Sequence, residues 1–295
     1  MTTTGKRDIR TAAAITLAAL LAIVTGARAE APRAAEVRTE HLTWTEIRDR
    51  LAAGHRTIVI PTGGTEQNGP HMVTGKHNMI VAATAERIAR ALGDALVAPV
   101  LAYVPEGDAA RRTGHMAYPG TISLPEPVFA KVLEAAAESF KTHGFTTIVL
   151  VGDSGGNQRP QEEVAARLSA AWRKDGVRVV NASTYYAASD GREWLARQGF
   201  TAAEIGRHAG LRDTSELLAV APDGIRKVKL STGGEGADGD ATKASREIGE
   251  ALLAAKVDAA VTEIRRAQAG DTAGGPDGGT AKPGLLARLK RLILG

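Results

Sequence analysis

The sequence of 295 residues contains no cysteine. Disulfide bonds, thiolate nucleophiles and cysteine-ligated metals are therefore excluded, and any metal site must use His, Asp, Glu or water. Aromatic residues are also scarce, at 4%, so the hydrophobic core has to be built mainly from Ala, Val, Leu and Ile. The formal net charge is only +4, and the basic residues are scattered except at the two termini. This distribution gives no indication of nucleic-acid binding.

The first residues have the pattern of a secretory signal peptide. Lys6, Arg7 and Arg10 precede an apolar run over residues 12–24, and Ala27-Arg28-Ala29 follows. A charged start, a short apolar middle and an Ala-x-Ala end are typical of an export signal. We therefore expect residues 1–29 to be removed after Ala29, and the protein to be periplasmic or secreted. An uncleaved membrane anchor is the alternative, but the run is shorter than the ~20 residues that a span needs.

The rest of the chain divides by composition into three parts. Residues 30–268 carry the pattern of one α/β domain, and residues 269–283 form a Gly-rich segment typical of a linker. Residues 284–295 alternate Leu and Ile with Arg and Lys, as in a short basic amphipathic helix. Such a tail can make a weak contact with an anionic membrane surface or pack on a partner subunit, and the sequence leaves both open.

Within the domain, buried-strand patterns alternate with helical ones. Short runs rich in Val and Ile are expected to form strands at 56–60, 95–104, 145–151 and 177–180, and a long Ala-rich helix is expected at 241–267. Pro61 and the pair Gly63-Gly64 end the first run. Strand and helix in alternation predict a mainly parallel sheet with helices on both faces.

Polar loops follow the predicted strands. The loop after the first strand carries Glu66, Asn68, His71 and His77, a long loop over residues 105–120 carries His115, and the loop after the third strand holds Asp153, Ser154 and Asn157. Parallel strands end at one edge of a sheet, where α/β proteins place their ligands. The sequence therefore predicts a site at this edge.

Four of these loops, in order, carry the motifs of a known family. They are Glu66-Gln67-Asn68-Gly69-Pro70-His71, Gly114-His115-Met116-Ala117-Tyr118-Pro119-Gly120-Thr121-Ile122, Gly152-Asp153-Ser154-Gly155-Gly156-Asn157 and His208-Ala209-Gly210. Together they resemble the creatininase (creatinine amidohydrolase) family from about Glu46 to the helix at Ala241. The resemblance implies a three-layer α/β/α sandwich, a homo-oligomer, and hydrolysis of a linear or cyclic amide at a paired zinc or manganese site.

The family's ligand positions are largely changed in this chain. Matched motif by motif, the first Glu of the family is kept as Glu66. The five other positions are, in order, His, Asp, His, Glu and Glu in the family. In this chain they are Asn68, His77, Ser154, Gly156 and Leu211. A neutral imidazole has one free nitrogen and cannot bridge two ions as a carboxylate does. Asn and Ser are poor zinc ligands. We therefore expect one divalent ion per chain at most, zinc or manganese, with no ion at all as the alternative.

Each candidate residue has a functional and a structural interpretation. The metal candidates are Glu66, His77, His71 and Asp153, the catalytic candidates are Glu66, His115 and Asp153, and the substrate-binding candidates are Asn68, Ser154, Asn157 and His208. Structurally, the carboxylates of Glu66 and Asp153 can accept amide N–H groups in their Gly-rich loops. His77 can cap the helix that begins near Asn78, and His71 can brace the turn at Gly69-Pro70.

The main functional hypothesis is an exported amidohydrolase that acts on a small-molecule amide. In it metal-bound water attacks the amide carbon, Glu66 or Asp153 transfers the proton and His115 stabilises the oxyanion. The alternative is a non-catalytic periplasmic binding or scaffold protein that kept the fold. A lesser alternative is a serine hydrolase, because Gly152 and Gly156 flank Ser154 at nucleophile-elbow spacing.

Overall fold

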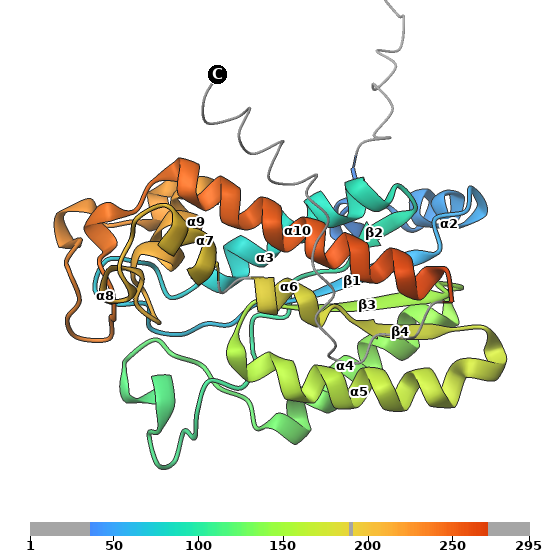
Figure 1. Cartoon of the computed structure of the whole chain (residues 1–295). Helices are drawn as coiled ribbons and strands as arrows, with labels where there is room; N and C mark the ends of the chain where they lie inside the picture. The colour runs from blue at the N-terminus through green and yellow to red at the C-terminus, as the bar shows by residue number, and fades with distance from the viewer. Residues whose placement is uncertain (1–35, 189–190, 271–295) are drawn as a thin grey trace, which may run out of the picture. The chain divides into compact units, whose positions relative to one another are not determined.

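The computed structural model describes residues 36–188 and 191–270, and these contain a four-stranded parallel sheet (Figure 1). The strand order is β2-β1-β3-β4, and every neighbouring pair is parallel. The bounds are Thr57–Thr62 for β1, Ala95–Val97 for β2, Thr147–Gly152 for β3 and Arg178–Asn181 for β4. All six residues of β1 and all six of β3 are buried, as continuous apolar runs in a parallel sheet should be.

Successive residues of the central strands contribute to two separate cores. Val59 of β1 and Val149 of β3 face one core, whereas Ile58 and Ile148 face the other. This follows from the two-residue period of a strand, which turns neighbouring side chains to opposite faces. Each face of the sheet therefore needs its own helical layer.

Two helical layers cover the sheet (Figure 1). On the face of Val59 lie α3 (Lys76–Leu92), α6 (Ser183–Ala188) and α10 (Arg246–Gln268), and on the opposite face lie α2 (Trp44–Ala52), α4 (Glu126–Thr142) and α5 (Gln158–Trp172). The predicted three-layer α/β/α sandwich is thus confirmed. Thr43 caps α2 with the reciprocal Glu46 contact of a capping box, and Ser245 caps α10.

Shorter helices gather near the start of α10. They are α7 (Arg192–Arg197), α8 (Ala202–Ile205) and α9 (Leu211–Val220). Helix α9 packs against both α10 and α3, and it supplies a small apolar cluster with Met72 and Ile225. This packing brings the segment after His208 up to the loop that follows β1.

Two predicted elements differ in extent. The expected strand at 95–104 ends at Val97, because Pro99 lacks the N–H that a ladder needs, and beyond it the chain makes only isolated bridges at Leu101 and Val104. The expected helix at 241–267 begins at Arg246, after a 3₁₀ turn over Ala241–Lys243, because the Ser245 side chain caps its first turn.

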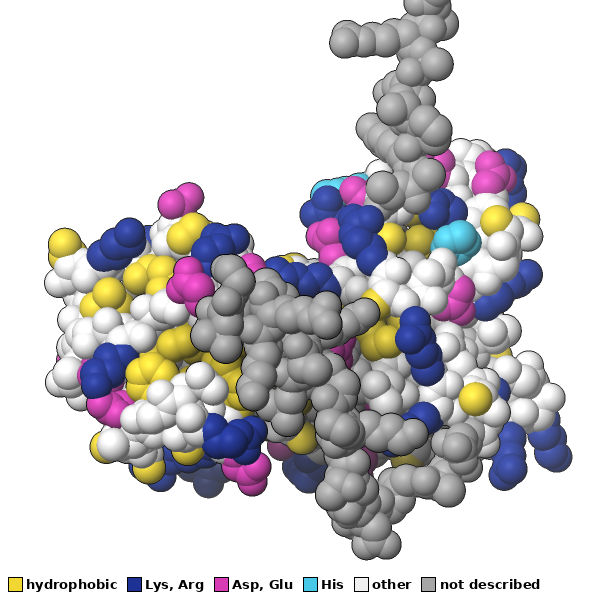
Figure 2. All heavy atoms as spheres, turned by 45° about the horizontal axis from the view of Figure 1, so that its top comes forward, with side chains coloured by type: hydrophobic (Ala, Val, Ile, Leu, Met, Phe, Trp, Pro, Cys, Tyr) yellow, Lys and Arg dark blue, Asp and Glu magenta, His cyan; other side chains and the backbone are white. Residues whose placement is uncertain are grey.

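The described surface is mixed in charge. On the face shown in Figure 2, basic and acidic side chains are interspersed with apolar ones. None of the helices in the described ranges is long and apolar enough to cross a membrane. The predicted signal peptide, most of the predicted linker and the predicted amphipathic tail lie outside the described residues.

Candidate functional site

The candidate residues meet at the carboxyl edge of the sheet. The loop after β1 carries Glu66 and leads into α3, which begins at Lys76. Strand β3 ends at Gly152, so Asp153 and Ser154 follow directly. Because β1 and β3 are neighbours in register up to Thr62 and Gly152, their loops emerge side by side, as the strand pattern predicted.

Glu66 forms an open cluster with two histidines. Its Oε2 lies 3.1 Å from Nε2 of His115, and its Oε1 lies 3.9 Å from Nδ1 of His208. One ligand atom from each of the three residues falls within 4.8 Å of the others. The two histidine side chains are 30% and 25% exposed, whereas that of Glu66 is 3% exposed. We call these three residues the open cluster.

Gln67 orients the two rings of the open cluster. Nε2 of His208 lies 3.0 Å from the Gln67 carbonyl oxygen, which can only accept a hydrogen bond. The same nitrogen also lies 3.1 Å from Nε2 of the Gln67 side-chain amide. Nδ1 of His115 lies 3.1 Å from the side-chain amide of Gln67. Burial lowers the pKa of both His115 and His208, which favours the neutral form of both rings.

On the other side of Glu66, His77 lies between two carboxylates. Its Nε2 is 2.9 Å from Glu66 Oε1, and its Nδ1 is 2.7 Å from Asp153 Oδ2. Burial disfavours the charged ring, but the hydrogen bonds to Asp153 and Glu66 prevail and raise the pKa of His77 to about 9. In the protonated ring both nitrogens donate, one to each carboxylate. Burial also opposes ionisation of Glu66, yet His77 holds the pKa of Glu66 well below its usual range.

Asp153 continues into a fully buried ion network. Its Oδ1 accepts from Tyr185 Oη at 2.8 Å and from Lys256 Nζ at 2.8 Å, and Lys256 also donates to Glu216 Oε2 at 2.7 Å. The side chains of Asp153, Lys256 and Glu216 are 2–3% exposed. Despite burial, Lys256 lowers the pKa of Asp153, and Asp153 raises that of Lys256. We call His77, Asp153, Lys256 and Glu216 the closed network.

A second buried carboxyl group belongs to the same site. Glu106 comes from the long loop after β2, and it is 6% exposed. Burial and the adjacent Glu66 carboxylate raise the pKa of Glu106 to about 8. The raised pKa favours the protonated form of Glu106 near neutral pH.

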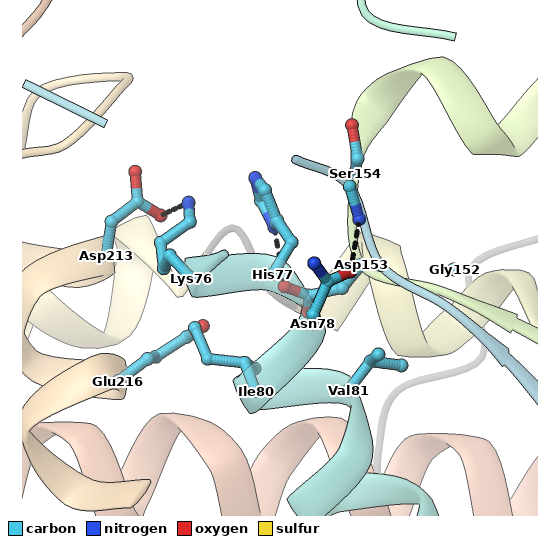
Figure 3. A network of polar contacts seen from close by, with 12 residues as sticks. Lys76, His77, Asn78, Ile80, Val81, Gly152, Asp153, Ser154, Asp213 and Glu216 are labelled. Atoms are coloured by element: carbon cyan, nitrogen blue, oxygen red, sulfur yellow. Dashed lines mark hydrogen bonds and ion pairs between the residues drawn. The ribbon is translucent and has the colours of Figure 1, made fainter. Parts of the chain in front are cut away.

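Lys76 lies beside His77 at the start of α3. Figure 3 shows the two side chains next to each other, with His77 turned to Asp153 at the end of β3 and Lys76 turned to Asp213 of α9. Nζ of Lys76 is 3.5 Å from Asp213 Oδ1. Lys76 is 1% exposed, so its ammonium group is a further buried charge of the site.

Other predicted residues hold backbone or packing roles. His71 is fully buried, and its Nε2 meets Thr214 Oγ1 at 3.0 Å, away from the open cluster. The side-chain amide of Asn68 donates to the carbonyl of Glu66 at 3.0 Å. That of Asn157 donates to the carbonyl of Gly63 at 2.8 Å and also to Thr62, so it fastens the end of β1.

Ser154 has neither the backbone shape nor the partner of a nucleophilic serine. Its φ and ψ are −97° and 150°, an extended conformation and not the sharp, strained turn of a nucleophile elbow. It is 2% exposed, and no hydrogen bond between its hydroxyl group and a histidine is found in the described part of the chain. Nearby, a Cβ added at Gly156 would overlap the carbonyl oxygen of Pro105.

The donor atoms of the open cluster fit a divalent ion. The open cluster supplies two neutral imidazoles and one carboxylate, a set that zinc uses in catalytic sites. The hydrogen bond of His208 to the Gln67 carbonyl is the outer contact that metal-bound histidines usually make. No second group of three ligands occurs in the described part of the chain. Both oxygens of the Asp153 carboxylate already have partners, His77 on one and Tyr185 and Lys256 on the other.

The sequence motifs predicted that Glu66, His77, Asp153, His115 and His208 lie at one edge of the sheet, and the structure places them together. Four residues of the site were not predicted from the sequence: Lys76, Glu106, Lys256 and Glu216. The positions of Lys76 and Glu106 in the sequence could have indicated a role in the site, because Glu106 lies in a polar loop after a strand and Lys76 lies at the start of the helix that follows one. The positions of Lys256 and Glu216 gave no such indication, because each sits in a helix whose packing onto the sheet only the tertiary structure reveals.

Comparison with known proteins agrees with this architecture. A family model described as "Creatininase: Creatinine amidohydrolase" matches residues 40–264. Creatinine amidohydrolase of Pseudomonas putida is 29% identical over 187 residues, which cover 62% of this chain and 71% of the relative. The mycofactocin precursor peptide peptidase of Mycolicibacterium smegmatis is 26% identical over 237 residues, 72% of this chain and 85% of that protein.

Solved structures give the same result. One described as "Creatininase Mn" superposes with a TM-score of 0.66 at 25% identity, covering 79% of this chain and 98% of that one. Another, a mutant creatininase described as "Zn-Zn type", gives 0.63 at 26% identity with the same coverage. The region matched by the family model, residues 40–264, contains every strand of the described sheet and every residue of the open cluster and the closed network. The chain therefore belongs to the creatininase family.

Proposed function

We propose that this chain hydrolyses the C–N bond of a small linear or cyclic amide, with one divalent ion held by Glu66, His115 and His208. The observation that carries the proposal is the open cluster itself: three ligand atoms within 4.8 Å, on rings that are still 25–30% exposed. Catalytic metal sites commonly use three protein ligands and leave a further position for water or substrate. Zinc and manganese are the candidates, since related structures are described with each.

The relatives support amide hydrolysis as the reaction class. One relative is a creatinine amidohydrolase and another is a peptide peptidase, so both are named for cleavage of a C–N bond. A third related structure is described as a mutant creatininase complexed with creatine, which is a small molecule. The two relatives act on different substrates, and we therefore propose the bond and not a particular molecule.

A bound divalent ion would supply Lewis acidity and a water molecule of lowered pKa. The residues of the chain then have separate tasks. Glu66, His115 and His208 hold the ion, and Gln67 fixes the orientation of both rings. Glu106 is protonated near neutral pH because its pKa is raised to about 8, and this proton is available for the leaving nitrogen. This assigns proton transfer to Glu106, whereas the sequence suggested Glu66 or Asp153.

The closed network would keep Glu66 in place. His77 donates to Oε1 of Glu66 at 2.9 Å and is itself held by Asp153, which Lys256 and Tyr185 fix from behind. A carboxylate anchored in this way loses little freedom when it binds a metal. In this proposal His77 and Asp153 are positioning residues and bind no ion.

The test combines metal analysis with hydrolysis. The purified full chain, loaded with zinc or manganese, is assayed for ammonia or amine release from a panel of linear and cyclic amides that includes creatinine and short peptides. We expect about one ion per chain and hydrolysis of at least one amide class. Glu106→Gln should retain the ion and lose hydrolysis, whereas His208→Ala should lose both. His143→Ala, at the C-cap of α4, is the matched control.

A chain that binds no ion and hydrolyses none of the amides would overturn the proposal. Specific binding of an amide without turnover would then favour the non-catalytic binding protein. Hydrolysis that survives chelation would instead favour a metal-independent enzyme.

Export and assembly are further parts of the proposal. The Ala27-Arg28-Ala29 pattern supports cleavage before Glu30 and a periplasmic or secreted location. Sequencing of the mature N-terminus in the native host should begin at Glu30, and recovery of an intact Met1 would contradict export. The family resemblance supports a homo-oligomer, which light scattering of the purified chain would measure.

A further inference from the structure

The ammonium group of Lys76 is buried next to the open cluster with few partners. The residue is 1% exposed, and its one ion pair within residues 36–188 and 191–270 is with Asp213, at 3.5 Å. That distance is beyond the usual 2.7–3.2 Å of an N–H···O hydrogen bond. An ammonium group has three donors. Burying it without hydrogen-bonded partners is costly, so its placement calls for an additional acceptor.

Asp213 is itself committed elsewhere. Its Oδ2 accepts the backbone N–H of Ala209 at 2.7 Å, in a turn where Ala209 has a φ of 55°. Its Oδ1 faces both Lys76, at 3.5 Å, and Arg212, at 3.6 Å. Asp213 Oδ1 therefore lies beyond ordinary hydrogen-bond distance of both cationic groups. Asp213 holds the loop and gives Lys76 only a distant counter-charge.

Lys76 lies beside the segments that carry the open cluster. Its neighbour in the chain, His77, reaches Glu66 Oε1 at 2.9 Å. Its counter-charge, Asp213, accepts the backbone N–H of Ala209 at 2.7 Å, and Ala209 directly follows His208 in the chain. These contacts place Lys76 between the segment of Glu66 and the segment of His208.

We propose that Lys76 is an anion-binding residue of the site and donates hydrogen bonds to an anionic oxygen of the bound molecule. In amide hydrolysis the oxygen of water bonds to the carbonyl carbon, and the C–N bond breaks with its electron pair on nitrogen, which takes up a proton. The products are a carboxylate and an amine. Lys76 binds the oxyanion that forms on the carbonyl oxygen and then the product carboxylate. The identity of this anion rests on the proposed function, whereas the anion site does not.

The experiment measures anion binding directly. The full chain is treated with a chelator and titrated with acetate and with methylphosphonate, a tetrahedral mimic, by calorimetry, and the titrations are repeated after zinc is added. We expect binding by the parent chain with and without zinc. Lys76→Met should weaken it roughly ten- to a hundredfold, the loss of one charge-assisted hydrogen bond. Lys76→Arg should retain most of it. Lys131→Met, at an exposed lysine of α4, is the control and should bind as the parent does.

A variant of opposite sign sharpens the test. Asp213→Asn keeps an oxygen that can accept from Ala209 but removes the negative charge that competes for Lys76, so it should bind both anions several-fold more tightly. It also decides the question if Lys76→Met does not fold. Equal affinities of parent, Lys76→Met and Lys76→Arg, or weaker binding by Asp213→Asn, would overturn the inference.

The two proposals fail separately. Anion binding that depends on Lys76, in a chain that hydrolyses no amide, would uphold the anion site and reject the hydrolase. Hydrolysis with one ion per chain and no dependence of anion binding on Lys76 would do the reverse.

Discussion

Glu66 separates two groups of charges that are built in opposite ways. In the closed network, every link from Glu216 through Lys256 and Asp153 to His77 is a hydrogen bond of 2.7–2.8 Å. In the open cluster, Glu66 meets two histidines at 3.1 and 3.9 Å, and those histidine side chains are 25–30% exposed. The same carboxylate thus contacts a buried, closely hydrogen-bonded network on one side and a partly exposed cluster on the other.

The difference shows how buried charge divides between stability and function. A buried ion that already has close partners has nothing left to bind, and removing one partner leaves another charge uncompensated. The open cluster differs because its two histidine side chains are partly exposed, so a ligand can reach them. The closed network should therefore control unfolding, and the open cluster should control metal binding. Substitutions in the two groups can break or sharpen that division.

The largest effect on stability is expected at Lys256. Lys256→Met leaves Asp153 and Glu216 buried without their shared cation, which should lower the free energy of unfolding by about 3–5 kcal/mol. Urea unfolding followed by circular dichroism measures the loss. Lys243→Met is the matched control, because Lys243 pairs with Glu204 at the surface, where one pair contributes about 1 kcal/mol or less. Similar losses in the two variants would show that the network does not control stability.

The largest effect on metal affinity, and a small one on folding, is expected at His115. His115→Ala removes one of three ligands and should weaken zinc binding by on the order of a hundredfold or more, beyond the loss typical of an outer contact. Its free energy of unfolding in chelator should stay within about 1 kcal/mol of the parent, because the ring is partly exposed. Competition with a chromophoric chelator gives the affinity. His71→Ala, whose ring lies apart on Thr214, should bind zinc as the parent does.

A smaller effect is expected at His77, which joins the two groups. His77→Ala leaves all three ligands but frees Glu66 from its anchor, so zinc affinity should fall roughly ten- to a hundredfold. The same chelator competition measures it, with His143→Ala as the control. Complete loss of zinc binding would mean that His77 is a ligand after all, and no loss would disconnect the closed network from the site.

The sequence predicted the layers of this fold well because its signals are local. The Val- and Ile-rich runs at Ile58–Ile60 and Ile148–Val151 could only be buried strands, and the helices between them fixed a parallel sheet. The motifs placed Glu66, His115 and His208 at one edge. The strand predicted over residues 95–104 is too long, because the apolar run contains Pro99, which has no N–H to donate to a neighbouring strand.

The division of labour within the site could not be predicted in the same way. His77 has the position of a ligand in the sequence, and only the two carboxylates on its nitrogens show that it donates on both sides. The partners that decide this are remote: Lys256 lies 103 positions from Asp153, on a helix whose face toward the sheet is set by packing. A pattern of residue types carries no information about which nitrogen of a ring is already occupied.

The contact at Gly156 has a consequence for redesign. The family resemblance assigns a glutamate to this position, but any side chain here would meet the carbonyl oxygen of Pro105. The segment that delivers Glu106 therefore fills the space that the missing side chain would need. A single Gly156→Glu substitution therefore cannot be accommodated unless the backbone at Pro105 moves. An engineer who wants a binuclear version would have to rebuild residues 104–107 first and only then replace the glycine.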